Sequence, residues 1–441
     1  MRYNSFFFKN FYIDSREVKE NSIFICLKGV NNDGHRYIKS TLKKYKKTII
    51  VCENSSKFVK QLKHHKRILL CNSTHKFLHD LAKVKRFLLN KNFFIGITGS
   101  SGKTTLKEMI YDVLKQFGTS YKSIKSYNNH IGLPLTLLNQ KIKSKFNVYE
   151  LGMNQSGEID FLSKILKPDI GIITNIGEAH LGNLGSINNI AKAKSELIYN
   201  IKAGGTVILN RDCKFFNKFK VIAKKNKLKI LSFGLNKKST IHYNVIDNFT
   251  FEVFFRNRKI KIKLNHLNIN IIQNILVCFL VLNFFKFNYL KIIKNFNKIK
   301  ILNGRGNIIR LKKKNIEIID DSYNSNPIAL KSSIKYFNNL PTNKNKIVVI
   351  GDMLELGKFS KAKHYEIGKL LVNLNFNNVF LVGKETKVIF DKIYKHCECK
   401  HYLNINKFKK DFKNVLVENS IILFKASNGV GLYKLLSNKI Y

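Results

Sequence analysis

The chain has 441 residues, of which 44% are hydrophobic and 12% aromatic, so it can bury the cores of roughly three domains and is not disordered throughout. Its formal net charge of +51 would suit a nucleic-acid-binding protein if Lys and Arg gathered on one surface. The lysines are instead spread along the whole chain, together with abundant Asn, Ile, Phe and Tyr. These are residues of A/T-rich codons, so we attribute the charge mainly to nucleotide bias of the genome and expect no nucleic-acid partner.

The cysteines and the apolar runs indicate the cellular compartment of the protein. The seven scattered cysteines are an odd number, which predicts free thiols in a reducing environment. The segment HCECKH (396–401) gathers His and Cys but lacks a second ligand pair, which makes a zinc site its weaker interpretation. The N-terminus has no signal-peptide pattern, and no apolar run reaches membrane-spanning length. We therefore expect a cytoplasmic protein without membrane insertion.

Three regions along the chain differ in their pattern of apolar and polar residues. Residues 1–91 hold short β-rich runs such as SIFICLKG and KTIIVCE between polar turns, which predicts a small N-terminal α/β domain. In residues 92–302 the apolar strands NFFIGITG, KFNVYELG, PDIGIITNIG and GGTVILN alternate with helical patterns. This alternation predicts a parallel sheet covered on both faces, with ligands at the carboxyl ends of its strands. The most apolar stretch, Ile272–Phe285, is expected to be a buried helix.

The alternating pattern restarts in residues 303–441, with NIEIIDD, NKIVVIGD, NNVFLVGK and SIILFKAS as strands. A second, Rossmann-like parallel sheet is predicted there. The fold class is thus α/β in three domains, and two nucleotide-type domains in series favour a cleft between them.

The segment FFIGITGSSGKTT (93–105) combines a strand, a glycine-rich turn and a helix start. It is shorter than the general Walker A loop, because two residues and not four separate its first glycine from Gly-Lys-Thr. Backbone N–H groups at the helix start can bind an anion, so the strand and helix around the loop favour phosphate binding over a plain helix cap. The nucleotide-binding residues predicted in this loop are Gly99, Ser100, Ser101, Gly102, Lys103, Thr104 and Thr105.

Two further side chains follow neighbouring predicted strands. Glu150 ends KFNVYE, and His180 lies just beyond PDIGIITNIG. A carboxylate and an imidazole at adjacent strand ends, beside the Thr104 hydroxyl, predict a divalent-cation site. Either residue alone would more often be an ordinary surface or core residue.

The motifs of the chain occur in one order, and in that order they closely resemble the Mur ligases over nearly the whole length. Three motifs lie in the N-terminal region: DSREV (14–18), SIFICLKG (22–29) and NNDGH (31–35). The others are TGSSGKTT, NNHIGLPLTLL (128–138), YELGMNQSGEI, TNIGEAHLGNLGS followed by AKAKSE, GRGN (304–307), DDSYNSNP (320–327) and GDMLELG (351–357). Within the family the pattern is most similar to the ligases that add D-alanyl-D-alanine to UDP-N-acetylmuramoyl-tripeptide.

This resemblance implies an ATP-dependent ligase of peptidoglycan precursor synthesis. ATP phosphorylates the tripeptide carboxylate, and the amine of D-alanyl-D-alanine attacks the acyl phosphate, with two Mg²⁺ ions as cofactors. By similarity Lys103 neutralises the phosphoryl group, and Thr104 and Glu150 hold one ion. Glu150 and His180 hold the second ion, supported by Lys194, which is carbamylated in the family.

The resemblance also implies which residues contact ATP and which contact the UDP-muramoyl substrate. Arg305 matches the γ-phosphate contact, and the remaining nucleotide contacts are Asn274, Asp321, Asn324 and Asn326. The residues implied to meet the UDP-muramoyl substrate are Ser15, Arg16, Asn32, Asp33, His35, Asn128, Asn129 and Thr136. Four positions depart from the family pattern: His130, Ile271, Ala426 and Asn428.

Two alternatives remain beside this hypothesis. One is the tripeptide-forming Mur ligase, whose Asp-Asn-Pro-Arg signature is absent from the chain. The other is a basic nucleic-acid-binding protein with a degenerate nucleotide fold, which would have lost Lys103, Glu150, His180 and Lys194. A monomer is expected, and the third residue of the tripeptide, lysine or diaminopimelate, stays open.

Overall fold

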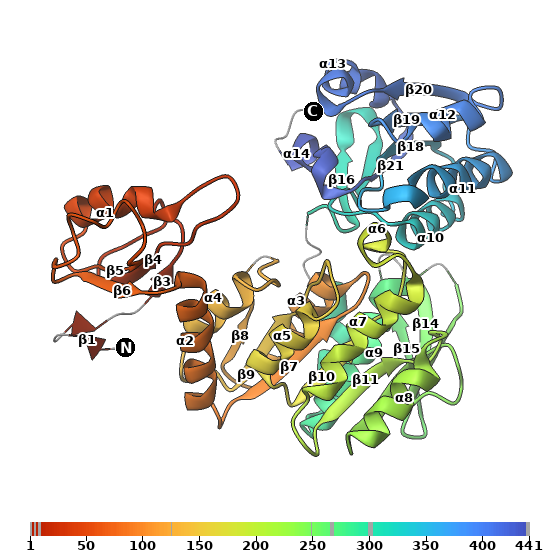
Figure 1. Ribbon diagram of the computed structural model, residues 1–441. Coiled ribbons are helices and arrows are strands. Elements are labelled where there is room, and N and C mark those ends of the chain that lie inside the picture. The colour runs from red at the N-terminus through yellow and green to blue at the C-terminus, as the bar shows by residue number, and fades with distance from the viewer. Residues whose placement is uncertain are drawn as a thin grey trace.

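Three α/β units follow one another along the chain (Figure 1). The computed structural model describes residues 2–3, 6–7, 10–124, 126–247, 249–264, 269–298 and 303–437. The N-terminal unit stands to one side, and the C-terminal unit lies over the edge of the central unit that carries α6. The expected boundary at residue 302 lies outside the described residues, and the domain limits at 91 and 302 stay predictions.

The N-terminal unit is a four-stranded parallel sheet of order β3-β4-β5-β6, preceded by the antiparallel pair β1 (Arg2–Tyr3) and β2 (Phe6–Phe7). Its elements are β3 (Asn10–Tyr12), β4 (Ser22–Ile25), η1 (Gly34–Tyr37), α1 (Ile38–Lys44), β5 (Ile49–Glu53) and β6 (Ile68–Cys71). Phe24 and Ile50 on one face pack with Ile38 of α1. The helix α2 (Thr74–Leu88) then crosses to the central unit, where it packs against α4 and α5.

The central unit is built on a nine-stranded sheet of order β15-β14-β13-β12-β11-β10-β7-β9-β8. Its parallel strands are β7 (Phe93–Thr98), β8 (Ser120–Lys122), β9 (Phe146–Glu150), β10 (Ile170–Ile173), β11 (Thr206–Asn210), β12 (Lys229–Gly234) and β13 (Ile241–Val245). β14 (Thr250–Phe255) and β15 (Arg258–Lys263) extend it in antiparallel fashion. Its helices are α3 (Lys103–Leu114), α4 (Gly132–Leu138), α5 (Glu158–Leu166), α6 (Leu181–Leu184), α7 (Ile187–Tyr199), α8 (Phe216–Lys225) and α9 (Ile269–Phe284), followed by η2 (Tyr289–Lys298).

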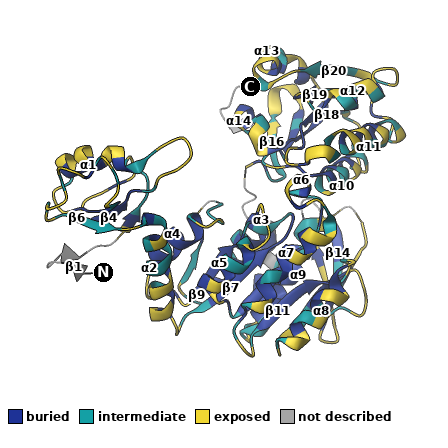
Figure 2. Cartoon of the chain, in the orientation of Figure 1, coloured by how far each residue is buried: buried dark blue, intermediate teal, exposed yellow. Residues whose placement is uncertain are grey.

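Alternation along the buried strands sends side chains to both faces of this sheet. Ile95 and Ile97 of β7 join the core formed with α3 and α9, while Phe94 joins the core formed with α5 and α7. Helices therefore cover both faces, and Figure 2 shows the strands buried beneath helices whose outer faces are exposed. The buried helix expected at 272–285 is confirmed as α9. Among the described residues, no helix combines the length and apolar character needed to cross a membrane.

The C-terminal unit is a six-stranded sheet of order β16-β17-β21-β18-β19-β20, parallel except for β16. Its strands are β16 (Asn307–Leu311), β17 (Ile316–Asp320), β18 (Asn345–Gly351), β19 (Asn378–Val382), β20 (Glu398–Tyr402) and β21 (Ser420–Lys425). Its helices are η3 (Lys312–Lys314), α10 (Pro327–Asn338), η4 (Gly357–Phe359), α11 (Ser360–Asn373), α12 (Lys387–Ile393), α13 (Ile405–Val415), η5 (Asn428–Val430) and α14 (Leu432–Ser437).

The three-domain α/β fold with two parallel sheets is confirmed. The antiparallel additions β14, β15 and β16 were not expected from the sequence. In the central sheet, pairing of Ile97 with Glu150 and of Thr98 with Ile173 brings the carboxyl ends of β7, β9 and β10 to one edge. The predicted phosphate loop, Glu150 and the segment leading to His180 all leave the sheet at this edge.

Candidate active site

The loop between β7 and α3 depends on two glycines. Gly99 has φ +150°, and a Cβ there would lie 1.9 Å from Oγ1 of Thr174. Gly102 has φ +80° and forms the N-cap of α3. Side chains are disfavoured at both positions, at Gly99 by a clash and at Gly102 by backbone strain. The loop thus turns directly from the strand into the helix N-terminus, where backbone N–H groups and the helix dipole favour an anion.

The strand end of β10 holds this loop in place. Asn175 Oδ1 accepts hydrogen bonds from the backbone N–H of Ser100 at 3.1 Å and of Ser101 at 2.9 Å. Thr174 Oγ1 donates to the Ser101 carbonyl at 2.8 Å, and Asn175 Nδ2 donates to Ser101 Oγ at 2.7 Å. The N–H groups of Ser100 and Ser101, expected to meet an anion, are therefore engaged by Asn175. An anion at this helix start would therefore be met by the backbone N–H groups of the first turn of α3.

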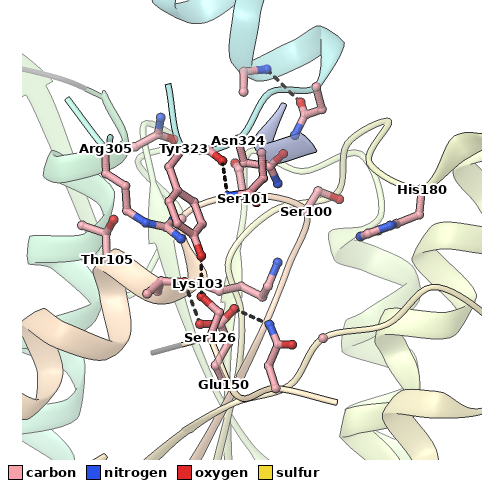
Figure 3. Close-up of a pocket in the computed structure, with 18 of the residues that line it drawn as sticks. Ser100, Ser101, Lys103, Thr105, Ser126, Glu150, His180, Arg305, Tyr323 and Asn324 are labelled. Carbon is pink, nitrogen blue, oxygen red and sulfur yellow. Dashed lines mark hydrogen bonds between the residues drawn. The ribbon is translucent and has the colours of Figure 1, made fainter. Parts of the chain in front are cut away.

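Lys103 opens α3 and lies at the centre of the site (Figure 3). Its Nζ donates to the Gly99 carbonyl at 2.9 Å. Burial lowers the pKa of Lys103, and the nearby Arg305 guanidinium lowers it further, while Glu150 opposes the shift. Two cations around one cavity form a site that a polyphosphate would complete.

A buried threonine–carboxylate pair lies beneath Lys103. Thr104 Oγ1 donates to Glu150 Oε2 at 2.7 Å, and Asn128 Nδ2 donates to Glu150 Oε1 at 2.8 Å. Mg²⁺ prefers oxygen ligands about 2.1 Å away in octahedral geometry, which puts adjacent ligand oxygens roughly 3 Å apart. The Thr104 and Glu150 oxygens have that chemistry and nearly that spacing, so the pair fits a Mg²⁺ ion.

His180 and Lys194 approach the same edge from the segment after β10. His180 lines the cavity, and its Nδ1 lies 2.6 Å from Oε2 of Glu355 in the C-terminal unit. Lys194 lies in α7 and is buried. Burial and the neighbouring Lys103 ammonium lower the pKa of Lys194 well below its usual value. A lowered pKa raises the fraction of neutral, nucleophilic amine, which is the form that CO₂ can carbamylate.

Asn274 of α9 is a buried polar residue that faces the cavity. Its Nδ2 has no hydrogen-bond partner among the described residues. Its Oδ1 lies 3.9 Å from the position that a Cβ on Gly102 would take, so the amide is beside the phosphate loop. A buried donor without a partner costs free energy, which a polar ligand at this place would recover.

The C-terminal unit closes the cavity from the other side. The Arg305 guanidinium carbon lies 4.2 Å from the centre of the Tyr323 ring. The Tyr323 and Ser126 hydroxyls lie 3.2 Å apart and connect the two units, as Figure 3 shows. Oδ2 of Asp321 accepts from Ser333 Oγ at 2.8 Å and pairs with Lys425 Nζ at 2.8 Å.

Between these walls lies one cavity of about 760 Å³, within the range of small-molecule sites. Most of the predicted catalytic and nucleotide-binding residues line it. They are Ser100, Ser101, Gly102, Lys103, Thr104, Thr105, Glu150, His180, Asn274, Arg305, Asp321, Asn324 and Asn326, together with Asn128 and Asn129. Asn326 also caps α10, because its Oδ1 accepts from the Ala329 N–H at 2.9 Å.

Several predicted residues lie elsewhere. Thr136 is buried in α4, where its hydroxyl donates to the Gly132 carbonyl. In the N-terminal unit, the buried His35 contacts Asp33 Oδ1 and accepts from the Glu53 N–H, and the exposed Arg16 pairs with Asp14. The predicted residues outside the cavity lining are Gly99, Lys194, Thr136, Ser15, Arg16, Asn32, Asp33 and His35. Their assigned roles stay predictions.

Four residues of the site were not predicted from the sequence. Asn175 anchors the loop, Tyr323 and Ser126 join the two units, and Glu355 contacts His180. Asn175 and Glu355 lie within the motifs TNIGEAHLG and GDMLELG. They could have been selected there because their side chains are polar. Nothing local marks Ser126, because its contact depends on how the units are placed. The described residues contain no group of three or more His, Cys, Asp and Glu side chains arranged for a metal ion.

Comparison with known proteins gives consistent matches along the chain. Three family descriptions match: the Mur ligase family catalytic domain at residues 8–86, the Mur ligase middle domain at 97–282, and the Mur ligase glutamate ligase domain at 304–428.

Curated relatives span nearly the same length. The UDP-N-acetylmuramoyl-tripeptide–D-alanyl-D-alanine ligase of Rickettsia prowazekii is 32% identical, over 96% of this chain and 93% of the relative. That of Bacillus subtilis is 31% identical, over 97% and 92%.

Solved structures agree. Crystal structure I of MurF from Acinetobacter baumannii has a TM-score of 0.87 at 25% identity, covering 98% of this chain and 93% of that one. MurF ligase from Thermotoga maritima in complex with ADP has a TM-score of 0.83 at 28% identity, covering 97% and 96%.

Proposed function

Because this chain belongs to the Mur ligase family, we propose that it joins D-alanyl-D-alanine to UDP-N-acetylmuramoyl-tripeptide while it converts ATP to ADP and inorganic phosphate. The product is the UDP-N-acetylmuramoyl-pentapeptide of peptidoglycan synthesis. The observation that carries the proposal is a cavity lined both by the predicted phosphate loop of the central unit and by Arg305 and Asp321 of the C-terminal unit. Relatives of the same activity match the chain over more than nine-tenths of its length.

The chemistry requires a carboxylate to become an electrophile. A carboxylate oxygen of the tripeptide attacks the γ-phosphorus of ATP and ADP leaves, giving an acyl phosphate. The amine of D-alanyl-D-alanine then attacks the acyl carbon, inorganic phosphate leaves, and the nitrogen loses a proton. Catalysis of both steps is mainly positioning and charge neutralisation. Lys103 of the central unit and Arg305 of the C-terminal unit both line the cavity, and we propose that they neutralise the transferring phosphoryl group.

We propose Mg²⁺ as the cofactor, in two sites. Thr104 and Glu150 would hold one ion, and Glu150 with His180 the second. Lys194 would assist the second ion as a carbamate, formed when its neutral amine adds to CO₂ and releases a proton. When bound, the ions offset the repulsion between the anionic substrate and ATP. The buried Thr104–Glu150 pair and the lowered pKa of Lys194 support this assignment.

We propose the remaining contacts from the resemblance to the family. Asn274 and Asp321 are proposed to meet the nucleoside of ATP, and Asn128 and Asn129 the muramoyl peptide. Ser15, Arg16, Asn32, Asp33 and His35 of the N-terminal unit are proposed to bind the UDP moiety. We further propose that the protein acts as a cytoplasmic monomer.

The test is ADP release measured with each of the two candidate UDP-tripeptides, ending in lysine or in diaminopimelate. We expect release that depends on D-alanyl-D-alanine and prefers one of the two tripeptides. Release that instead requires a UDP-dipeptide and a diamino acid would favour the tripeptide-forming ligase. Binding to DNA that persists at physiological salt, without ADP release, would favour the nucleic-acid-binding alternative.

A further inference from the structure

The central and C-terminal units meet through their backbones at α6. The Gly182 N–H donates to the Glu355 carbonyl at 2.9 Å. A Cβ on Gly182 would lie 2.7 Å from the Gly357 nitrogen, and one on Gly357 would lie 3.0 Å from the Gly182 Cα. Figure 1 shows α6 rising from the central unit to the C-terminal one. The two glycines therefore allow a contact that no side chain could enter without moving a backbone.

Side chains on either side extend this contact. Glu178 Oε1 lies 2.8 Å from Lys363 Nζ, and both side chains are mostly shielded, with 19% and 18% exposed. Ile328 Cδ1 lies 3.1 Å from the position of a Cβ on Gly177. The segment 177–182 is thus fitted against the C-terminal unit along its length. It is also the segment that carries His180.

Within this contact, His180 and Glu355 lie directly opposite each other. Both have left-handed backbones, with φ +63° and +65°, which non-glycine residues rarely adopt. His180 Nδ1 lies 2.6 Å from Glu355 Oε2. Because an ionised carboxylate has only acceptor sites, we place the proton of this short nitrogen–oxygen contact on Nδ1. His180 lines the cavity, and a proton on Nδ1 leaves the lone pair of Nε2 available to a ligand.

We propose that Glu355 is a positioning residue that fixes the tautomer and orientation of His180, and that it does so only when the C-terminal unit is docked on α6. The inference rests on the proposed role of His180 as a cation ligand. A carboxylate that accepts from the far nitrogen of a ligating histidine orients the ring and raises its basicity. Because this carboxylate belongs to the other unit, domain docking completes the cation site, so the site is competent only in the closed enzyme.

The first experiment measures the tautomer without any metal. Long-range ¹H–¹⁵N spectra of the full chain labelled with ¹⁵N-histidine distinguish protonation at Nδ1 from protonation at Nε2, and His180→Gln identifies the signal. We expect the Nδ1–H form in the wild type and in Glu355→Gln, whose amide oxygen still accepts. We expect a mixture in Glu355→Ala. An unchanged signal in Glu355→Ala would overturn the proposal.

The second experiment measures Mn²⁺ binding by electron paramagnetic resonance in the presence of ADP. Loss of such an outer partner typically weakens metal affinity by about 10- to 100-fold, which we expect for Glu355→Ala, with recovery in Glu355→Gln. Lys363→Met is the matched control, because it removes an ion pair from the same contact without touching His180. An equal loss in Lys363→Met, with His180 still in the Nδ1–H form, would show that the affinity does not depend on the Glu355 contact and would overturn the positioning role.

A third variant tests the dependence on docking. Gly182→Ala leaves Glu355 intact but places a methyl group against the Gly357 backbone. We expect it to show the same mixed tautomer as Glu355→Ala, and a wild-type spectrum would refute the coupling to docking. The two roles can also be told apart. If neither the wild type nor any variant binds Mn²⁺, the proposed role of His180 as a cation ligand fails. If the tautomer still depends on Glu355 in that case, the positioning role stands.

Discussion

Replacement of Asn274 by leucine is expected to raise the stability of the protein and to lower its affinity for nucleotide. Asn274 is buried in α9, and its Nδ2 has no hydrogen-bond partner among the described residues. A buried unsatisfied donor costs about 1–3 kcal/mol. Leucine has nearly the same shape and removes the donor, so Asn274→Leu is expected to raise the free energy of unfolding of the nucleotide-free protein.

The same change should weaken nucleotide binding. If the Asn274 amide bonds to the nucleotide, its loss leaves a polar group of the ligand buried and unpaired, at a cost of about 1–3 kcal/mol. Since 1.4 kcal/mol is a factor of ten, the dissociation constant for ADP should rise by about 5- to 150-fold. The two effects have opposite sign, so a general disturbance of the fold cannot produce both.

Thermal unfolding without ligand and titration calorimetry with ADP measure the two quantities. Asn147→Leu is the control: Asn147 is also buried in the central sheet, but its Nδ2 donates to the Phe93 carbonyl at 3.1 Å and its Oδ1 accepts from Ser144 at 2.7 Å. It should destabilise the protein and leave ADP affinity unchanged. A destabilised Asn274→Leu variant with wild-type ADP affinity would refute the reasoning.

Three other substitutions test separate parts of the site. Lys103→Ala removes the central cation of the cavity and should abolish D-alanyl-D-alanine-dependent ADP release in a coupled assay; unchanged release would exclude the phosphate-loop assignment. Gly99→Ala would place a Cβ 1.9 Å from Thr174 Oγ1, which should displace the loop. We expect the displaced loop to lower kcat/KM by about 100-fold. Wild-type kinetics would show that the loop tolerates a side chain. Burial lowers the pKa of Lys194, so the unfolded chain binds more protons at this group and the stability of the metal-free, uncarbamylated protein rises with pH up to about 10.4. Lys194→Met should remove that part of the pH dependence in urea unfolding at pH 7 and pH 9, and an identical slope in both proteins would contradict the pKa shift.

The parallel strands could be predicted because they are buried on both faces. β7, β9, β10 and β11 are apolar runs between helical patterns, which local sequence displays directly. β15, with the sequence RKIKIK, exposes its lysines at the edge of the sheet and has a single buried residue, so its sequence gives a weak signal. Its antiparallel pairing also depends on long-range partners that composition does not reveal.

The edge of the central sheet that carries the candidate site could be predicted for a different reason. Parallel strands share one carboxyl edge, so the side chains after β7, β9 and β10 had to meet. The contacts between units could not be predicted, because His180–Glu355 and Ser126–Tyr323 join segments that lie far apart in sequence. Their distances depend on the placement of the domains, which local sequence does not determine.

The most direct test of the proposed reaction follows an oxygen atom. If the tripeptide carboxylate is labelled with ¹⁸O and supplied with ATP and D-alanyl-D-alanine, an acyl phosphate requires one labelled oxygen to leave with the inorganic phosphate. We expect phosphate with a single ¹⁸O, formed in equal amount with the UDP-pentapeptide in mass spectra. Unlabelled phosphate, or ADP formed without the pentapeptide, would contradict the assignment of this cavity as the active site of a D-alanyl-D-alanine-adding ligase.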